Sequence, residues 1–322
     1  MLLHNYKRFS PRVKGLQLGL ELEIEGRRLP TGSIDGWEVK PDGSLRNGLE
    51  YVTRGSVSPE GVKTALTVLS KHLSVSSVRN SIRCSTHVHV NVQDLSLKQI
   101  ATVMTAYYIV EPLLVEFCGV ERKGNLFALR LLDSAAPLNR FMQAAKRGSL
   151  QPLGNDDIRY AALNLTSLPR FGTLEYRTMR GIDKDPSEVL PWVDLLVHLH
   201  RHCENRFNDP AEVLALFSAL GPRQFAERVL GRDDLFDPAL ENDMYESARI
   251  AQWFAYQLEV VVPEKKPQQD EEVNLVFEDP AAVVRAGHRN ARPDVAAAQW
   301  VRYEGLVRQA RPIDLEGPDN ED

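Results

Sequence analysis

Residues 19–26 alternate strictly between apolar and acidic side chains, in the order Gly-Leu-Glu-Leu-Glu-Ile-Glu-Gly. This period of two is typical of a half-buried β-strand, in which successive side chains point to opposite faces of the sheet. One face of the strand therefore carries Glu21, Glu23 and Glu25, and the other face is apolar. A solvated sheet face normally mixes residue types, whereas a row of carboxylates suits a hard cation such as Mg²⁺. We interpret this strand as one wall of a metal site, with a solvated face as the alternative.

Three later segments repeat the alternation of a polar and an apolar face. Residues 85–92 read Ser-Thr-His-Val-His-Val-Asn-Val, and residues 172–180 read Gly-Thr-Leu-Glu-Tyr-Arg-Thr-Met-Arg. A shorter segment at 49–53 offers one glutamate. Together these segments add the polar side chains of Glu50, His87, His89, Asn91, Thr173, Glu175 and Arg177. If the segments lie in one sheet, we expect their polar faces to converge in a single site.

Strands and helices do not alternate regularly along the chain. Short strands are predicted around Trp37 and at residues 160–168, in addition to the four segments above. Helices are predicted after the N-cap residues Ser58 and Ser96, at Leu138–Lys146, from Asp185 to about Arg206, and at about 210–230 and 239–259. This order favours an α+β fold with an antiparallel sheet, helices packed on one face and an open concave catalytic face.

The composition excludes several classes of protein. The 322 residues carry a formal net charge of -5, whereas a general nucleic-acid-binding surface more often has a basic balance. The three cysteines are isolated, which argues against a disulfide framework and favours a reducing, cytoplasmic setting. The N-terminus lacks the apolar region of a signal peptide, and we expect no membrane-spanning segment.

The composition changes after Pro263. Residues 1–262 are predicted to form the catalytic domain, which begins with a basic leader at residues 1–15. Residues 264–272 are charged and rich in glutamine, which is typical of a linker. The rest of residues 263–322 is predicted to hold one or two short helices and an acidic, disordered tail.

Six short motifs occur in a fixed order along the chain. They are Gly19-Leu20-Glu21-Leu22-Glu23, Asp42-Gly43-Ser44-Leu45, Leu49-Glu50-Tyr51-Val52-Thr53, His87-Val88-His89-Val90, Arg159-Tyr160-Ala161-Ala162-Leu163-Asn164-Leu165 and Gly172-Thr173-Leu174-Glu175-Tyr176-Arg177. In this order and spacing they resemble the amidoligase family, carboxylate–amine ligases related to glutamine synthetase and glutamate–cysteine ligase and often found in phages and bacterial gene clusters. The resemblance covers roughly residues 15–205.

The resemblance implies a glutamine-synthetase-like sheet that binds ATP with two or more Mg²⁺ ions, with Mn²⁺ as a substitute. The implied metal ligands are Glu21, Glu23, Glu50, His87, His89 and Glu175. Arg177 is implied to contact the transferred phosphate or the substrate, with Glu50 and Asp42 as further catalytic residues. The long arginine-rich ATP segment of glutamine synthetase is not recognisable, so the candidates for ATP binding are Arg122, Asn125, Arg130, Tyr160, Asn164 and Arg180.

The reaction implied by the resemblance has two steps. A substrate carboxylate attacks the γ-phosphate of ATP and forms an acyl phosphate, and an amine then displaces phosphate to give an amide. Metal ions and arginines suit this chemistry, because phosphoryl transfer is catalysed mainly by positioning and charge neutralisation. The expected partners are a carboxylate on a small molecule, peptide or protein, an amine, and a second copy of the chain in a homo-oligomer.

Two other classes of function stay open at this stage. A metal-dependent hydrolase would use the histidines and glutamates to hold a metal that activates water, but it leaves Arg177 unexplained. A non-catalytic binding protein would use the acidic face only to solvate the sheet.

Overall fold

The computed structural model describes residues 2–154 and 158–261 of the chain. These residues belong to one compact unit, Met1–Glu264, and the second unit, Lys265–Asp322, lies outside the described residues. The predicted linker, short helices and acidic tail of residues 263–322 therefore lie outside them as well. Within the described part the fold is α+β, as predicted.

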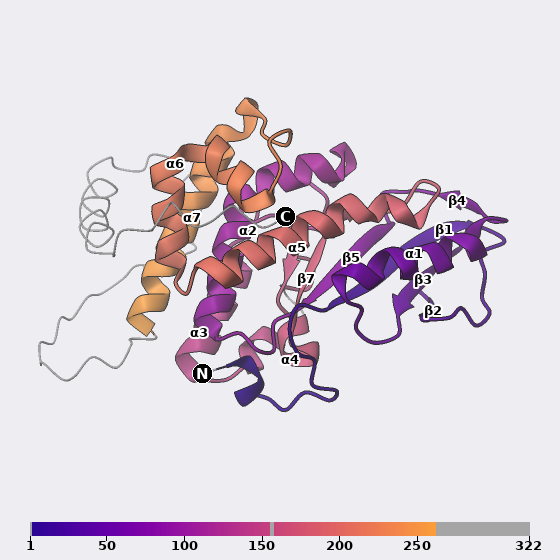
Figure 1. Ribbon diagram of the computed structural model, residues 1–322, viewed down its shortest axis with the longest axis horizontal. Helices are drawn as coiled ribbons and strands as arrows, with labels where there is room; N and C mark the ends of the chain where they lie inside the picture. The colour runs from indigo at the N-terminus through magenta and orange to yellow at the C-terminus, as the bar shows by residue number, and fades with distance from the viewer. Residues whose placement is uncertain (1, 155–157, 262–322) are drawn as a thin grey trace, which may run out of the picture. The chain divides into compact units, whose positions relative to one another are not determined.

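This unit contains a seven-stranded antiparallel sheet (Figure 1). The strands are β1 (Leu18–Arg27), β2 (Trp37–Pro41), β3 (Gly48–Thr53), β4 (Ser77–Arg79), β5 (Ser85–Asn91), β6 (Leu163–Asn164) and β7 (Thr173–Arg180). Their order is β2-β3-β1-β5-β7-β6, and β4 pairs with β1. The four segments with alternating faces thus become the neighbouring strands β3, β1, β5 and β7.

Seven α-helices are formed by the described residues. They are α1 (Pro59–Leu73), α2 (Leu97–Cys118), α3 (Ala136–Arg147), α4 (Ser167–Phe171), α5 (Leu190–Arg206), α6 (Pro210–Leu230) and α7 (Glu241–Val261). The predicted caps begin α1 and α2: Ser58 Oγ accepts a hydrogen bond from Gly61 N, and Ser96 forms a capping box with Gln99.

Helices α1 and α5 cover the apolar face of the sheet. Figure 1 shows α1 and α5 lying across the strands. Trp37 Nε1 on β2 donates a hydrogen bond to Ala65 O in α1 at 3.0 Å, and the Tyr176 hydroxyl on β7 lies 2.8 Å from His200 Nε2 on α5. The side chains at the alternate positions of each strand, such as Glu175 next to Tyr176, therefore form the polar face on the other side of the sheet.

The centre of the polar face is more buried than the open surface that was predicted. Glu23, His87, His89 and Glu175 are each less than a tenth exposed. The Phe171 ring, at the end of α4, packs against the His89 ring in a T-shaped pair with the ring centroids 5.9 Å apart. The alternation of side chains predicts which face of the sheet a residue occupies. It does not predict the burial of that face, because the connecting segments that cover it have no repeating pattern.

Helix α2 is long and apolar enough to cross a membrane by length and composition alone. However, 89% of the apolar window is buried inside the protein, where α2 packs against β7, α5, α6 and α7. This burial is that of a core helix, which passes the same test of length and composition.

The chain between Tyr160 and Leu168 differs from the prediction of an extended segment. It is a strand only at Leu163–Asn164, because Asn164 Oδ1 accepts a hydrogen bond from Thr166 N at 2.9 Å and turns the chain into α4. Gly172 ends α4 with φ 71°, a left-handed conformation that glycine adopts without strain, and β7 begins at the next residue. Strand β4 was not predicted, since three residues are too few to show an alternation.

Glu111, near the middle of α2, is a buried carboxyl group outside the predicted site. It is 1% exposed, and its Oε2 accepts a hydrogen bond from Leu131 N at 2.7 Å. Burial raises the pKa of Glu111 to about 8. The folded protein therefore holds a proton at Glu111 that the unfolded chain releases above a pKa near 4.5.

This difference predicts that Glu111 lowers the stability of the fold as the pH rises. Between the two pKa values the folded state binds one more proton, so this group lowers the free energy of unfolding by about 1.4 kcal/mol per pH unit. Glu111→Gln keeps an acceptor for Leu131 N and cannot ionise. We expect its melting temperature to exceed that of the wild type by a margin that grows from pH 5 to pH 8. A margin that is constant with pH would show that Glu111 does not titrate in this way.

Candidate active site

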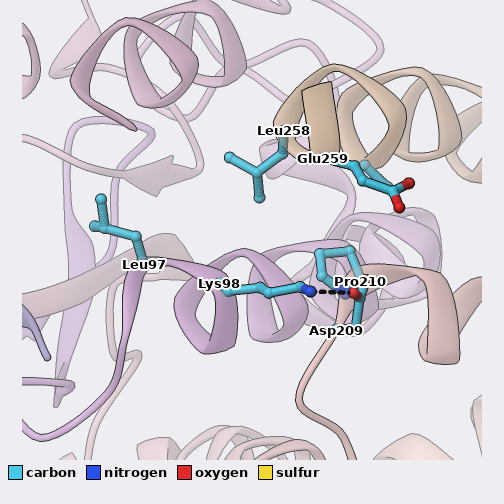
Figure 2. A pocket seen from close by; sticks show the side chains of 7 residues that line it. Leu97, Lys98, Asp209, Pro210, Leu258 and Glu259 are labelled. Carbon is cyan, nitrogen blue, oxygen red and sulfur yellow. Dashed lines mark ion pairs between the residues drawn. The ribbon is translucent and has the colours of Figure 1, made fainter. Parts of the chain in front are cut away.

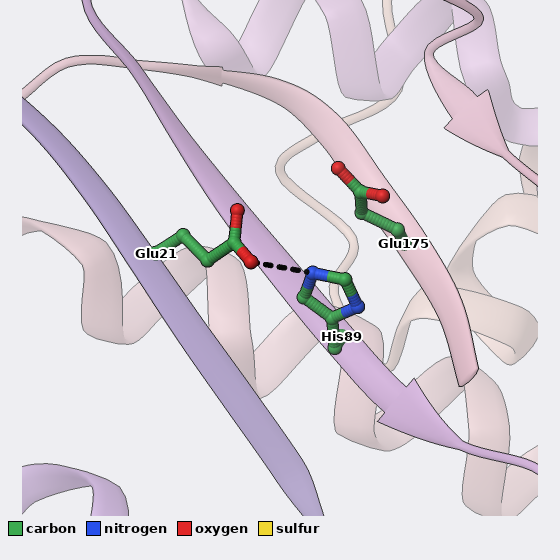
Figure 3. A group of neighbouring side chains, drawn as sticks. All are labelled: Glu21, His89 and Glu175. Carbon is green, nitrogen blue, oxygen red and sulfur yellow. Dashed lines mark ion pairs between the residues drawn. The ribbon is translucent and has the colours of Figure 1, made fainter. Parts of the chain in front are cut away.

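The polar faces of β1, β5 and β7 meet at the centre of the sheet. The antiparallel register places Glu21 opposite His87 and His89 opposite Glu175. One ligand atom each from Glu21, His89 and Glu175 lies within 4.8 Å of the other two (Figure 3). The sequence prediction that Glu21 and Glu175 share one face and lie close together is confirmed.

Glu21 lies between the two histidines. Its Oε2 is 3.2 Å from His87 Nδ1, and its Oε1 is 3.2 Å from His89 Nε2. Burial alone would raise the pKa of Glu21, but its hydrogen bond with His87 and its charge interactions with both histidines hold it well below its usual range. Burial would also lower the pKa of His89, yet Glu21 and Glu175 raise it. Glu21 is therefore ionised, which is the form that binds a cation.

Two buried nitrogen atoms on this face have no hydrogen-bonding partner within the described part of the chain. They are His89 Nε2, which lies close to Glu21 without hydrogen-bond geometry, and Arg177 Nε. Unsatisfied buried polar atoms cost about 1–3 kcal/mol each, so both atoms are suited to a ligand. Two carboxylates and one imidazole are donors that fit a divalent cation, Mg²⁺ by their oxygens and Mn²⁺ by the whole set.

Ser85 connects the acidic row of β1 to the histidine row of β5. Glu23 Oε2 accepts hydrogen bonds from Ser85 N at 2.9 Å and from Ser85 Oγ at 2.5 Å. The same Oγ lies 2.7 Å from His87 Nε2. Ser85 was not among the predicted site residues, although it stands two residues before His87 and therefore on the same face. The alternation could have identified it.

Glu50 extends the acidic surface onto β3. It pairs with Glu23 of β1 on one side and with Lys40 of β2 on the other. Burial, together with the charges of Glu21, Glu23 and Asp42, raises the pKa of Glu50 to about 7, and Lys40 opposes this shift. Asp42 lies in the turn after β2, where its Oδ1 accepts a hydrogen bond from the main chain at 2.7 Å. The negative charge concentrated here would be relieved by a bound cation.

Strand β7 supplies both a carboxylate and a guanidinium group. Glu175 Oε2 accepts a hydrogen bond from Asn164 Nδ2 at 2.7 Å, and Glu175 Oε1 accepts one from Arg177 Nη1 at 2.6 Å. The same Nη1 lies 3.4 Å from His87 Nδ1. Burial would raise the pKa of Glu175, but His89, His87 and Arg177 hold it below its usual range. Glu175 is therefore also ionised in the folded protein.

Arg122 supports the backbone of β7 at a break in the strand register. The pairing of β5 with β7 shifts between Thr86 and Val88. Arg122 is 2% exposed, and it donates from Nε to Thr178 O and from Nη2 to Arg177 O, both at 2.7 Å. Two of its nitrogens thus hold the main chain at Arg177, and its contact with ATP stays a prediction.

The other predicted ATP-binding residues do not form one cluster. Asn164 touches the central group, defined as Glu21, His89 and Glu175, through its hydrogen bond to Glu175. Arg130 forms a fork with Asp133, with its Nη2 3.0 Å from Asp133 Oδ1. The remaining three make contacts away from Glu21, His89 and Glu175: Asn125 with Ile82 O, Tyr160 with Arg159, and Arg180 with Cys118 O and Glu121.

A small pocket lies in a different part of the molecule, where α2 and α6 begin and α7 ends (Figure 2). Apolar side chains line it beside an ion pair in which Lys98 Nζ lies 2.5 Å from Asp209 Oδ2. None of the predicted site residues lines this pocket.

Residues 60–199 match a family model described as "Putative amidoligase enzyme". The predicted resemblance to the amidoligase family is confirmed. The amidoligase match contains β5 with His87 and His89, and β7 with Glu175 and Arg177. It begins after the strands that carry Glu21 and Glu50. The family description indicates an amide-forming type of ligase. None of the curated proteins that were compared with the chain matches it.

Proposed function

We propose that this protein is an ATP-dependent carboxylate–amine ligase that requires Mg²⁺ or Mn²⁺ and forms an amide through an acyl phosphate. The observation that carries the proposal is the gathering of three ionisable groups, Glu21, His89 and Glu175, beside Arg177, in a sheet whose strands β5 and β7 belong to the amidoligase match. The substrates are a carboxylate on a small molecule, peptide or protein and an amine. A cytoplasmic setting belongs to this proposal and agrees with three cysteines that are buried and free.

The central side chains have separate roles in this proposal. Glu21, His89 and Glu175 hold one divalent cation, and Glu23, Glu50 and His87 are the candidates for a second. Such cations neutralise phosphate charge when they are bound. Ser85 fixes the carboxylate of Glu23 through two hydrogen bonds to Oε2, which leave Oε1 without a hydrogen bond from Ser85. The chain thus pre-positions its ligands before any substrate binds.

Arg177 is the group that contacts the phosphate as it is transferred. Its guanidinium is planar and always charged, which suits bidentate contact with phosphate oxygens. Its Nη1 is held by Glu175, while its Nε is buried and without a hydrogen-bonding partner among the described residues. When the carboxylate oxygen attacks the γ-phosphorus, the bond to ADP breaks and Arg177 stabilises the charge on the transferred group.

The second step needs an acceptor for the proton that the amine loses. The amine nitrogen forms a bond to the acyl carbon, and inorganic phosphate leaves. Glu50 and Asp42 lie at the β2–β3 side of the site, where either carboxylate can accept that proton. A hydrolase would use the same cations but would have no use for Arg177 beside the reacting group.

A pooled screen tests this function. Purified full-length protein is incubated with ATP, Mg²⁺, a mixture of carboxylic acids and peptides, and a mixture of amines, and mass spectrometry follows ADP and new amides. We expect ADP and one amide to form in equal amounts, and neither to form with Glu175→Gln. Asp234→Asn is the matched control, because Asp234 is an exposed carboxylate paired with Arg232. Cleavage of an amide without ATP would instead indicate a hydrolase.

A further inference from the structure

The basic segment, residues 7–14, is fixed across one end of the polar face. Asn91, which follows His87 and His89 in the same row of β5, donates from Nδ2 to Val13 O at 3.3 Å and to Gly15 O at 2.8 Å. Val13 N donates in turn to Gln93 Oε1 at 3.0 Å. The basic segment therefore borders the candidate active site instead of extending into solvent.

Positive charge in this segment is only partly compensated. It contains Lys7, Arg8, Arg12 and Lys14, and no acidic residue precedes Glu21 in the sequence. Arg12 forms an ion pair with Asp94 at 3.1 Å. The other three side chains are exposed, and none forms an ion pair with an acidic residue of the described ranges. Lys7 Nζ donates a hydrogen bond to Pro169 O, and three charges therefore remain without an acidic partner in the described ranges beside the site.

An exposed aromatic ring lies between the basic segment and the central group. Phe171 is 57% exposed, and its ring contacts His89. Its main-chain oxygen accepts a hydrogen bond from Gln93 Nε2 at 2.9 Å. A Cβ atom at Gly172 would lie 3.1 Å from Phe9 Cζ, so the basic segment packs directly against the turn that presents Phe171. The ring therefore offers an apolar contact beside the charged side chains.

We propose that the basic segment and Phe171 form a docking surface for an acidic peptide, one of whose carboxylates reaches Glu21, His89 and Glu175 for activation. The proposal rests on the proposed function, because it identifies the acid as a peptide with several carboxylates. Charge complementarity carries it: neighbouring carboxylates meet Lys7, Arg8 and Lys14, and an apolar side chain covers Phe171. A nucleic acid is the other polyanion to consider, but the chain's formal net charge of -5 does not favour it.

Binding can be measured without turnover. The probes are a fluorescein-labelled peptide of eight glutamates and one phenylalanine, the same peptide with glutamines, and a labelled oligothymidylate of eight nucleotides. Fluorescence anisotropy is measured with the full-length protein at low and high salt. The test variants are Lys7→Gln/Arg8→Gln/Lys14→Gln and Phe171→Ala. The matched control, Lys63→Gln/Lys71→Gln/Lys146→Gln, removes the same charge from exposed positions on α1 and α3.

We expect the glutamate peptide to bind more tightly than the other two probes and to lose affinity at high salt. The triple variant of the basic segment should weaken binding roughly tenfold, since each exposed ion pair contributes a modest amount. Phe171→Ala should weaken it severalfold, and the control should remain within about twofold of the wild type.

Three results would overturn the docking surface: equal binding of the glutamate and glutamine peptides, equal losses in the triple variant and its control, or tighter binding of the oligothymidylate. None of these measurements requires ATP. If peptide binding depends on the basic segment but the protein makes no amide, the proposed function is contradicted and the docking surface is supported. If the protein forms an amide but does not bind the peptide through the basic segment, the docking surface is contradicted and the proposed function is supported.

Discussion

Glu23→Gln is expected to lower turnover by about 10- to 100-fold while the protein stays folded, because groups that orient the ligands of a metal typically contribute on this scale. Glutamine keeps the size of the side chain and an oxygen that accepts the hydrogen bonds from Ser85, whose Oγ lies 2.5 Å from Glu23 Oε2. What it removes is one negative charge from the acidic row. The defect should therefore lie in the affinity for the cation, and excess Mg²⁺ or Mn²⁺ should restore part of the rate.

The measurement is the rate of ADP formation across a metal titration, with Glu38→Gln as the matched control. Glu38 is an exposed glutamate on β2, where Lys40 lies 3.3 Å from it. The control should follow the wild-type titration. If Glu23→Gln instead gives the wild-type rate and the wild-type metal dependence, Glu23 is a structural partner of Ser85 and not part of the metal site.

Arg177→Lys is expected to slow the phosphoryl step by about 100- to 1,000-fold, the typical loss when one charge contact with a transition state is removed. Lysine keeps the positive charge and can still pair with Glu175, but it loses the planar fork. Since the ligand atoms of Glu21, His89 and Glu175 are untouched, the affinity for Mn²⁺ should change little. Single-turnover measurement of ADP formation, alongside Mn²⁺ binding, separates the two effects.

Arg201→Lys is the control for this substitution, because Arg201 is an exposed arginine that pairs with Glu60 at 3.2 Å. The alternative account treats Arg177 and Glu175 as an ion pair that only stabilises β7. It predicts near-normal turnover for folded Arg177→Lys, and that outcome would remove Arg177 from the catalytic machinery.

The sequence was most informative where a side-chain period could be counted. The alternation in β1, β5 and β7 identified which face each glutamate, histidine and arginine occupies, and their order made one sheet the expected arrangement. Strand pairing then brings these side chains together, because an antiparallel register that buries one apolar face places Glu21 opposite His87. Ser58 and Ser96 likewise predicted the helix starts, since their caps depend on local hydrogen bonds.

Features that depend on long-range contacts could not be predicted in this way. Arginine is a residue type that often binds phosphate, which made Arg122 a candidate from the sequence. In the structure its guanidinium instead donates to the carbonyl oxygens of residues more than fifty positions later. The burial of His89 depends on Phe171, which lies in a connection without a repeating pattern. The basic leader was visible in the sequence, whereas its position beside Asn91 was not.

The most direct test of the central claim follows oxygen atoms. The pool of carboxylic acids and peptides is labelled with ¹⁸O in the carboxylate, and the protein is supplied with unlabelled ATP, Mg²⁺ and amines. If the carboxylate attacks the γ-phosphorus, one ¹⁸O atom must leave the acid with phosphate, so mass spectrometry should find singly labelled inorganic phosphate in the same amount as the amide. Unlabelled phosphate formed together with an amide, or an amide formed without ATP, would contradict activation of the acid by phosphoryl transfer.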